Sequence, residues 1–186
     1  MLSSLQELKN VVPIFGSIER KNSVCILQRL QELATSEEKK IPVLISSGGG
    51  DVIWGMAIVE MIRILPLLGD IEISTVGIGF VASMAASIWL TPPREHRMLT
   101  KKSQLYFHPI KSYTNINVGG RLDSTISEFA EMLALEKSIK QREIELVEFL
   151  AAETKLAATT VGKRIKTGWL VPAEEALKLG LAAKVI

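Results

Sequence analysis

The chain has 186 residues, with 22 Lys and Arg against 20 Asp and Glu, so its formal net charge at pH 7 is only +2. This balance, without a concentrated basic face, argues against a nucleic-acid partner. The apolar fraction of 47% and the mean hydropathy of +0.26 are high for a soluble monomer and indicate spare apolar surface for self-association. The length predicts one domain over residues 1–186.

Single features argue against several other classes of protein. Cys25 is the only cysteine, so no internal disulfide can form, and we expect a small core residue in a reducing, cytoplasmic compartment. The N-terminus has no secretory pattern. Residues 74–90 carry no charge, but this run is shorter than the about 20 apolar residues of a bilayer span, so we expect no membrane association. Two isolated histidines argue against a metal site, and we expect no cofactor.

Strand and helix patterns alternate along the chain and predict an α/β fold with a mainly parallel sheet and right-handed crossovers. The predicted strands cover residues 11–15, 41–45, 71–76, 98–99 and 105–107, and the predicted helices cover 21–34, 51–65 and about 82–90. Asp51 is the expected N-cap of the second helix, and Pro66 is expected just beyond its end.

Two of these helices are apolar on nearly every side. Between residues 52 and 65 only Glu60 and Arg63 are charged, and the helix after Ser83 has no charge at all. Such helices must be buried all round. In a domain of this size, an oligomer interface would help to cover them.

A long amphipathic segment, residues 122–153, has no internal Gly or Pro. As one helix it would be about 48 Å long at about 1.5 Å per residue, which exceeds the diameter of about 40 Å of a globule of this size. We therefore expect a protruding helix that needs a partner. The alternative is a helix–turn–helix broken near Gln141.

The first candidate for chemistry is the turn Ser47-Gly48-Gly49-Gly50-Asp51, between a strand and a helix. Its glycines allow a ligand to approach the backbone, and its N–H groups suit a developing oxyanion. The alternative is an ordinary tight turn. A phosphate-binding loop is excluded because no Lys-Ser/Thr follows.

Ser83 and His108 are the candidate nucleophile and general base. Ser83 lies among small residues at the next strand-to-helix junction, and open α/β sheets place their sites at such strand ends. His108 follows a strand-like apolar run. Together with the glycine turn they would supply the three groups that acyl transfer requires, which are a nucleophile, a general base and an oxyanion hole. The alternatives are a packed helix serine and a buried structural histidine.

Four stretches of the chain resemble motifs of the proteolytic subunit of the Clp protease, the ClpP family within the ClpP/crotonase-like fold. The family motifs N-S-P-G-G, G-Q-A-A-S-M-G-A, M-I-H-Q-P and F-L-S-A-x-E-A-x-x-Y-G-L correspond here to Ser46–Gly50, Gly79–Ala86, Tyr106–Pro109 and Trp169–Leu181. Their order and approximate spacing agree from about Val11 to Ile186. The resemblance implies repeated ββα/βαβ units, a mainly parallel sheet and a protruding handle helix at about residues 122–153.

The resemblance also implies roles for particular residues. Ser83 would be the nucleophile, His108 the general base, and the N–H groups of Gly50 and Met84 the oxyanion hole. The handle helix would meet another ring, because relatives form seven-membered rings stacked in pairs around a chamber. The implied substrate is a peptide or an unfolded protein.

The chain departs from the family pattern at the third triad position, where Thr167 replaces an aspartate. The lost acid costs about 10⁴ in rate in the Ser-His-Asp example, and the cations Lys163, Arg164 and Lys166 would, if close to His108, disfavour an imidazolium further. Threonine could still accept a hydrogen bond from the ring.

Three smaller departures concern the substrate groove and the partners. Phe80 stands where relatives often have Gln, and small insertions surround residues 67–71 and 111–117. The chain starts about ten residues before its first strand, whereas relatives have a longer segment that docks an unfolding ATPase. This departure argues against an ATPase partner.

The leading hypothesis is a ClpP-like serine peptidase in which Thr167 or a water molecule orients His108. The alternative from another class is a catalytically weak or inactive ring or scaffold subunit, which Thr167 favours. A crotonase-like acyl-CoA enzyme is a third interpretation, disfavoured because Ser83 and His108 would be idle. Asp51 and Asp123 are candidates for a replacement acid.

Overall fold

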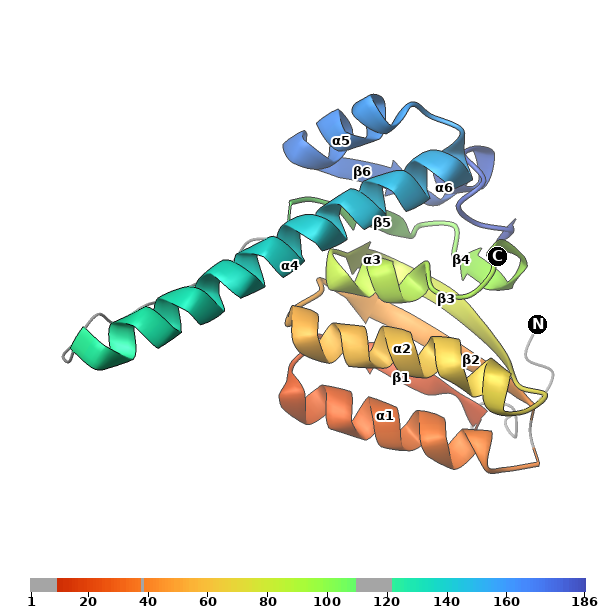
Figure 1. Cartoon of the computed structure of the whole chain (residues 1–186). Helices are drawn as coiled ribbons and strands as arrows, with labels where there is room; N and C mark the ends of the chain where they lie inside the picture. The colour runs from red at the N-terminus through yellow and green to blue at the C-terminus, as the bar shows by residue number, and fades with distance from the viewer. Residues whose placement is uncertain (1–9, 38, 110–121) are drawn as a thin grey trace. The chain divides into compact units, whose positions relative to one another are not determined.

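The computed structural model describes residues 10–37, 39–109 and 122–186, with only the backbone of 122–133 and 135. The chain divides into two compact units, residues 1–107 with 168–186, and residues 108–167. Figure 1 shows the elements of both. The single domain over residues 1–186 stays a prediction.

The first unit is built on a mostly parallel sheet, which confirms the predicted α/β fold. Its strands have the order β1-β2-β3-β4-β7, all parallel, while β5 pairs in parallel with β3, and β6 pairs antiparallel with β5. In chain order the elements are β1 (Val12–Phe15), α1 (Arg20–Ala34), β2 (Lys40–Ser47), α2 (Val52–Leu68), β3 (Glu72–Ala82), α3 (Met84–Trp89), η2 (Arg94–His96), β4 (Arg97–Leu99), β5 (Gln104–Phe107), β6 (Trp169–Pro172), α6 (Ala173–Lys178) and β7 (Lys184–Val185).

Alternating burial along the strands fixes the side on which the core forms. In β2, Ile41, Val43, Ile45 and Ser47 are buried and the residues between them are not, because successive side chains of a strand point to opposite faces. Helices α1, α2 and α3 lie side by side along the sheet (Figure 1), and their buried residues complete the core.

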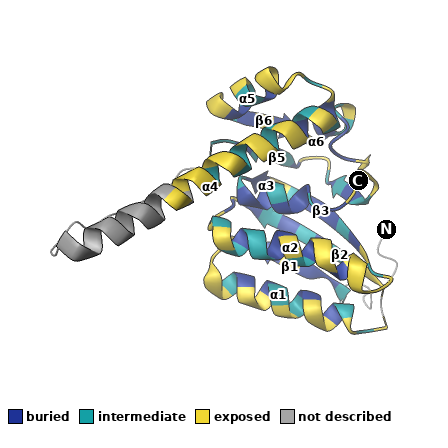
Figure 2. Cartoon of the chain, in the orientation of Figure 1, coloured by how far each residue is buried: buried dark blue, intermediate teal, exposed yellow. Residues whose placement is uncertain are grey.

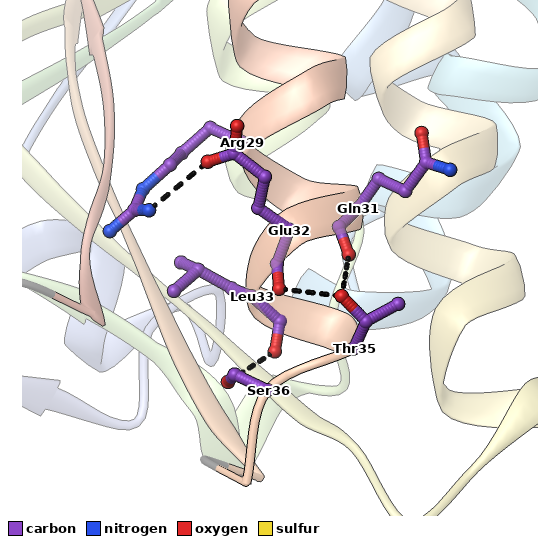
Figure 3. Close-up of polar contacts among 6 residues, drawn as sticks. All are labelled: Arg29, Gln31, Glu32, Leu33, Thr35 and Ser36. Carbon is purple, nitrogen blue, oxygen red and sulfur yellow. Dashed lines mark hydrogen bonds and ion pairs between the residues drawn. The ribbon is translucent and has the colours of Figure 1, made fainter.

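Hydroxyl groups at its carboxyl end help to terminate α1 (Figure 3). The Thr35 hydroxyl lies 3.3 Å from the carbonyl oxygen of Gln31 and 2.9 Å from that of Glu32, and the Ser36 hydroxyl donates to the carbonyl of Leu33 at 2.7 Å. These contacts satisfy carbonyl groups that have no partner within the helix. The chain is then free to turn back into β2.

The start of α2 was predicted correctly and its end was not. The Asp51 carboxylate accepts the Trp54 N–H at 3.0 Å, which confirms the N-cap. The helix continues through Pro66 to Leu68, so the prediction that Pro66 lies beyond its end was wrong. Proline in the last turn removes only the bond to the carbonyl four residues earlier, and α2 tolerates this loss.

The prediction of all-round burial holds for α3 and fails for α2 in the single chain. Met84, Ala85, Ala86, Ile88 and Trp89 of α3 are all buried. On α2, by contrast, Ile53 is 70%, Leu67 82% and Leu68 76% exposed, and Figure 2 shows exposed parts of α2 in yellow. Cys25 on α1 is also exposed, so its prediction as a core residue was wrong.

Strand β3 is longer than predicted, because glycine makes it irregular without ending it. We expected a strand over 71–76, a glycine-rich turn and a helix from about residue 82, but β3 continues to Ala82 and α3 begins at Met84. A Cβ at Gly77 would lie 2.5 Å from Leu99 Cδ2, and Gly79 has a φ of +66°. Glycine inside a strand often marks close packing or a bulge, and here it marks both.

The second unit contains α4 (Leu122–Thr154) and α5 (Ala158–Thr167). At 33 residues, α4 is about 50 Å long, which confirms one continuous helix; the break near Gln141 was a wrong alternative. Gln141 donates to Glu145 at 3.2 Å, one turn on, and Lys140 pairs with Glu136 at 2.7 Å. The hydrogen bond to Glu136 raises the pKa of Lys140. Such spacings stabilise exposed helices.

In the part of the chain that the structure describes, no helix has the length and apolar character needed to span a membrane. The insertion around residues 111–117 lies outside the described residues.

Candidate active site

Ser83 occupies a strained backbone conformation at the junction of β3 and α3. Its φ is +56° and its ψ −128°, a combination that costs a residue other than glycine on the order of 1–3 kcal/mol. The Ser83 N–H donates to the Tyr106 carbonyl at 2.9 Å, and the Ser83 carbonyl accepts from the N–H groups of Ala86 and Ser87. These bonds hold the strained turn, so Ser83 precedes the helix and does not pack within it.

The glycine turn after β2 is held from both sides. The buried Ser47 hydroxyl accepts the Gly49 N–H at 3.1 Å. Ile18 donates its N–H to the Gly49 carbonyl at 2.9 Å, and its own carbonyl accepts the Asp51 N–H at 2.8 Å. Between these bonds, the N–H of the exposed residue Gly50 has no hydrogen-bond partner among the described residues. A donor is therefore available at the turn.

The glycine turn and Ser83 lie in direct contact. A Cβ atom at Gly49 would lie 2.7 Å from the Cβ of Ser83, 2.8 Å from the Ala82 carbonyl oxygen and 3.0 Å from the Met84 nitrogen, and Gly49 has a φ of +94°. Only glycine fits both this space and this conformation. The Met84 N–H is the first of α3 and has no partner within the helix. The structure thus brings Gly50, Ser83 and Met84 together in one unit.

His108 begins the second unit and is half-buried. Its Nδ1 atom lies 2.7 Å from the carbonyl oxygen of Pro109. A carbonyl oxygen can only accept, so this hydrogen bond requires the proton on Nδ1, and Nε2 is then left as an acceptor. The tautomer follows from the chemistry of the partner. It is the tautomer that a general base needs.

Thr167 is the last residue of α5 and is exposed. Its hydroxyl lies 3.2 Å from the carbonyl oxygens of both Lys163 and Arg164. The hydroxyl proton is therefore directed at its own helix, and only the oxygen lone pairs can receive another donor.

The two candidate replacement acids have different outcomes. The Asp51 carboxylate is engaged with the Trp54 N–H at the start of α2, whereas the Asp123 side chain lies outside the described residues. No group of three His, Cys, Asp or Glu side chains among the described residues could hold a metal ion.

Three features of the site were not predicted. Tyr106 supplies the carbonyl that anchors Ser83, and its ring stacks on the 45% exposed Phe80 at 6.0 Å. The Pro109 carbonyl engages His108. A backbone carbonyl leaves no signal in a sequence, so the first and last of these could not have been found there. The aromatic pair is visible only once β3 and β5 are known to be neighbours.

The mostly parallel sheet flanked by helices is typical of the ClpP/crotonase-like class of fold, and here a serine stands at the strained turn between β3 and α3. The family model "Clp protease" matches residues 2–186, and the chain therefore belongs to the Clp protease family. One similar relative is the ATP-dependent Clp protease proteolytic subunit 2 of Gluconobacter oxydans, which is 30% identical over 94% of this chain and 73% of its own length.

Two further comparisons agree with this assignment. The ATP-dependent Clp protease proteolytic subunit of Paracoccus denitrificans is 26% identical over 99% of this chain and 84% of its own. Among solved structures, a ClpP1 mutant from Listeria monocytogenes has a TM-score of 0.76 at 21% identity, covering 97% of this chain and 94% of its own. This structural likeness supports the fold, and the family match supports a ClpP-like hydrolase.

Proposed function

We propose that this protein is a serine peptidase in which Ser83 is the nucleophile. The observation that carries the proposal is the positive φ of Ser83 at the end of β3, in contact with the glycine turn. Strained strand-to-helix turns expose the nucleophile in other hydrolases, and backbone strain clusters at active sites. The substrate would be a peptide or an unfolded protein.

The reaction would proceed through an acyl-enzyme. Ser83 Oγ attacks the carbonyl carbon of the scissile peptide bond while its proton passes to Nε2 of His108. The oxyanion that forms accepts hydrogen bonds from the N–H groups of Gly50 and Met84. Both N–H groups are available as donors, because the described residues of the glycine turn and of α3 provide no acceptor for them. His108 then protonates the leaving amine, and a water molecule, deprotonated by His108, hydrolyses the ester.

The Pro109 carbonyl takes over the orienting part of the missing acid in this proposal. It accepts from Nδ1 at 2.7 Å and so holds the ring in the tautomer whose Nε2 atom can take the proton of Ser83. A neutral carbonyl does not stabilise the imidazolium as a carboxylate does. We therefore expect a slower enzyme than one with a full triad, in which Thr167 is not needed.

The second candidate is a subunit that keeps the fold without the chemistry. The observation in its favour concerns Thr167, which stands at the third position of the triad. Its hydroxyl is directed at the carbonyls of Lys163 and Arg164, and it carries no negative charge that could stabilise a protonated His108. In both candidates we expect a homo-oligomeric ring. The exposed apolar residues Ile53, Leu67 and Leu68 on α2 support self-association.

Labelling with a fluorophosphonate probe tests the proposed function. The oligomeric state of the wild type, Ser83→Ala and His108→Ala proteins is first compared, so that only assembled protein is labelled. We expect the wild type to be labelled, Ser83→Ala to be unlabelled, and His108→Ala to be labelled far more slowly. An assembled wild type that takes up no probe would refute the peptidase and support the inactive subunit.

A further inference from the structure

The pairing of β2 with β3 changes register just before Ser83. Ile45 pairs with Gly77 and Ser47 pairs with Val81, so β2 advances by two residues while β3 advances by four. The extra residues form a bulge around Gly79, whose φ is +66°. Bulges leave backbone groups without ladder partners, and these groups need partners from elsewhere.

The hydroxyl of Ser103 supplies partners on both sides of the bulge. It donates to the Gly77 carbonyl at 2.8 Å and accepts the Gly79 N–H at 3.0 Å. It also lies 2.6 Å from the Thr100 hydroxyl. A hydroxyl has only one proton, and that of Ser103 goes to the carbonyl, so Thr100 must be the donor in this contact. Ser103 is 1% exposed, and its hydroxyl has its one donor and two acceptor positions filled.

The backbone of Ser103 ties this network to the rest of the unit. Its N–H donates to the Thr100 carbonyl at 2.9 Å, and its carbonyl accepts the Ala173 N–H at 2.9 Å at the start of α6. These two backbone hydrogen bonds fix the position of Ser103 and therefore that of its hydroxyl. A buried network in which every group is satisfied is rigid.

From these contacts we infer that Ser103 is a positioning residue, whose hydroxyl sets the bulge of β3 that carries Ser83 to the glycine turn. The inference rests on the proposed function of Ser83. Only four positions separate Gly79 from Ser83, and over them β3 pairs with β5 until the Ser83 N–H reaches the Tyr106 carbonyl. A change in the bulge would therefore shift Ser83 relative to Gly49, with which it is in close contact.

The experiment compares Ser103→Ala with Ser103→Thr, which keeps the hydroxyl. Thr154→Val is the matched control, because the buried Thr154 hydroxyl also donates to a carbonyl, that of Leu150 at 2.6 Å, but lies at the end of α4 and not in β3 or a strand paired with it. The second-order rate constant of fluorophosphonate labelling is measured on folded, assembled protein. Since displacement of a catalytic group by about 1 Å can cost about 100-fold, we expect Ser103→Ala to lose about tenfold or more.

The two other variants separate positioning from stability. Ser103→Thr is expected to restore most of the labelling rate, and Thr154→Val is expected to lower thermal stability without slowing labelling. The inference is overturned if Ser103→Ala labels as fast as the wild type, or if Thr154→Val slows labelling as much.

Hydrogen exchange of the peptide covering residues 77–84 gives a second readout that does not depend on activity. Ser103→Ala is expected to raise exchange at the Gly79 and Ser83 amides, and Thr154→Val to leave it unchanged. A wild type without labelling would refute the nucleophile, and the exchange result would still decide whether Ser103 positions Ser83. Unchanged exchange in Ser103→Ala would refute the positioning role itself.

Discussion

The substitution Gly49→Ala tests the contact on which the proposed site depends. The added methyl would lie 2.7 Å from Ser83 Cβ and 2.8 Å from the Ala82 carbonyl oxygen, at a φ of +94°. The φ alone costs alanine about 1–2 kcal/mol, and overpacking against atoms that cannot rotate away costs about 1–3 kcal/mol. We expect a loss of about 3 kcal/mol in the free energy of unfolding, or about 10 °C in Tm for a chain of this length.

The same substitution should affect labelling more strongly than it affects folding. The atoms that must move belong to Ala82, Ser83 and Met84, and displacement of the nucleophile by about 1 Å can cost about 100-fold in rate. The assay is fluorophosphonate labelling of the assembled protein at a temperature well below Tm, alongside thermal denaturation at one fixed protein concentration.

Gly48→Ala is the matched control in the same turn. A Cβ at Gly48 meets nothing within 4 Å, and a surface substitution of this kind changes stability by about 0.5 kcal/mol or less. If Gly49→Ala behaved like Gly48→Ala in both measurements, the turn would not lie against Ser83, and the argument for the oxyanion hole would fail.

Substitutions at four further positions have distinct expected outcomes. Thr167→Val should leave the labelling rate unchanged, because its hydroxyl is directed at its own helix; a large loss in rate would make Thr167 the orienting group in place of Pro109. Asp51→Ala should cost about 1 kcal/mol of unfolding free energy by removing the cap, whereas Asp51→Asn should keep both stability and labelling; slower labelling of Asp51→Asn would reveal a replacement acid. Ser23→Ala should raise the unfolding free energy by about 1 kcal/mol in urea titrations, because the buried Ser23 hydroxyl has no hydrogen-bond partner among the described residues; a loss of stability would show that a partner exists. Leu67→Glu should weaken self-association in sedimentation velocity, because Leu67 is 82% exposed, with Lys101→Glu as a polar surface control; equal assembly of both variants would remove α2 from the interface.

The fold was predictable wherever one local signal determined the outcome. The strands 11–15 and 41–45 and the first helix were found to within a few residues because apolar periodicity and flanking polar residues agree there. The long helix was found because nothing in residues 122–153 breaks it. Helix α5 and the antiparallel strand β6 were not predicted. In β6 the sheet partner, and not a local pattern, determines the structure.

Burial was predicted less well than secondary structure, because composition does not say which molecule covers a surface. The apolar sequence of α2 predicted burial on every side, yet Ile53, Leu67 and Leu68 are exposed in the single chain. Cys25 has apolar neighbours in the sequence, but in a helix such neighbours point in different directions, and Cys25 lies on the exposed side of α1.

The sequence singled out Ser83 as the candidate nucleophile, but it did not predict the conformation of this residue. Small residues around a serine at a strand end indicate a place for chemistry, but glycines before it also predict a turn, and that prediction ended β3 too early. The structure resolves the conflict through Ser103, a residue 20 positions later in the chain, whose hydroxyl lets Gly77 and Gly79 stay within the strand. Because β3 continues to Ala82, the chain must turn from β3 into α3 at the single residue Ser83. The strain of Ser83 therefore depends on a contact between distant residues, and no pattern within Gly79–Ala86 could have predicted it.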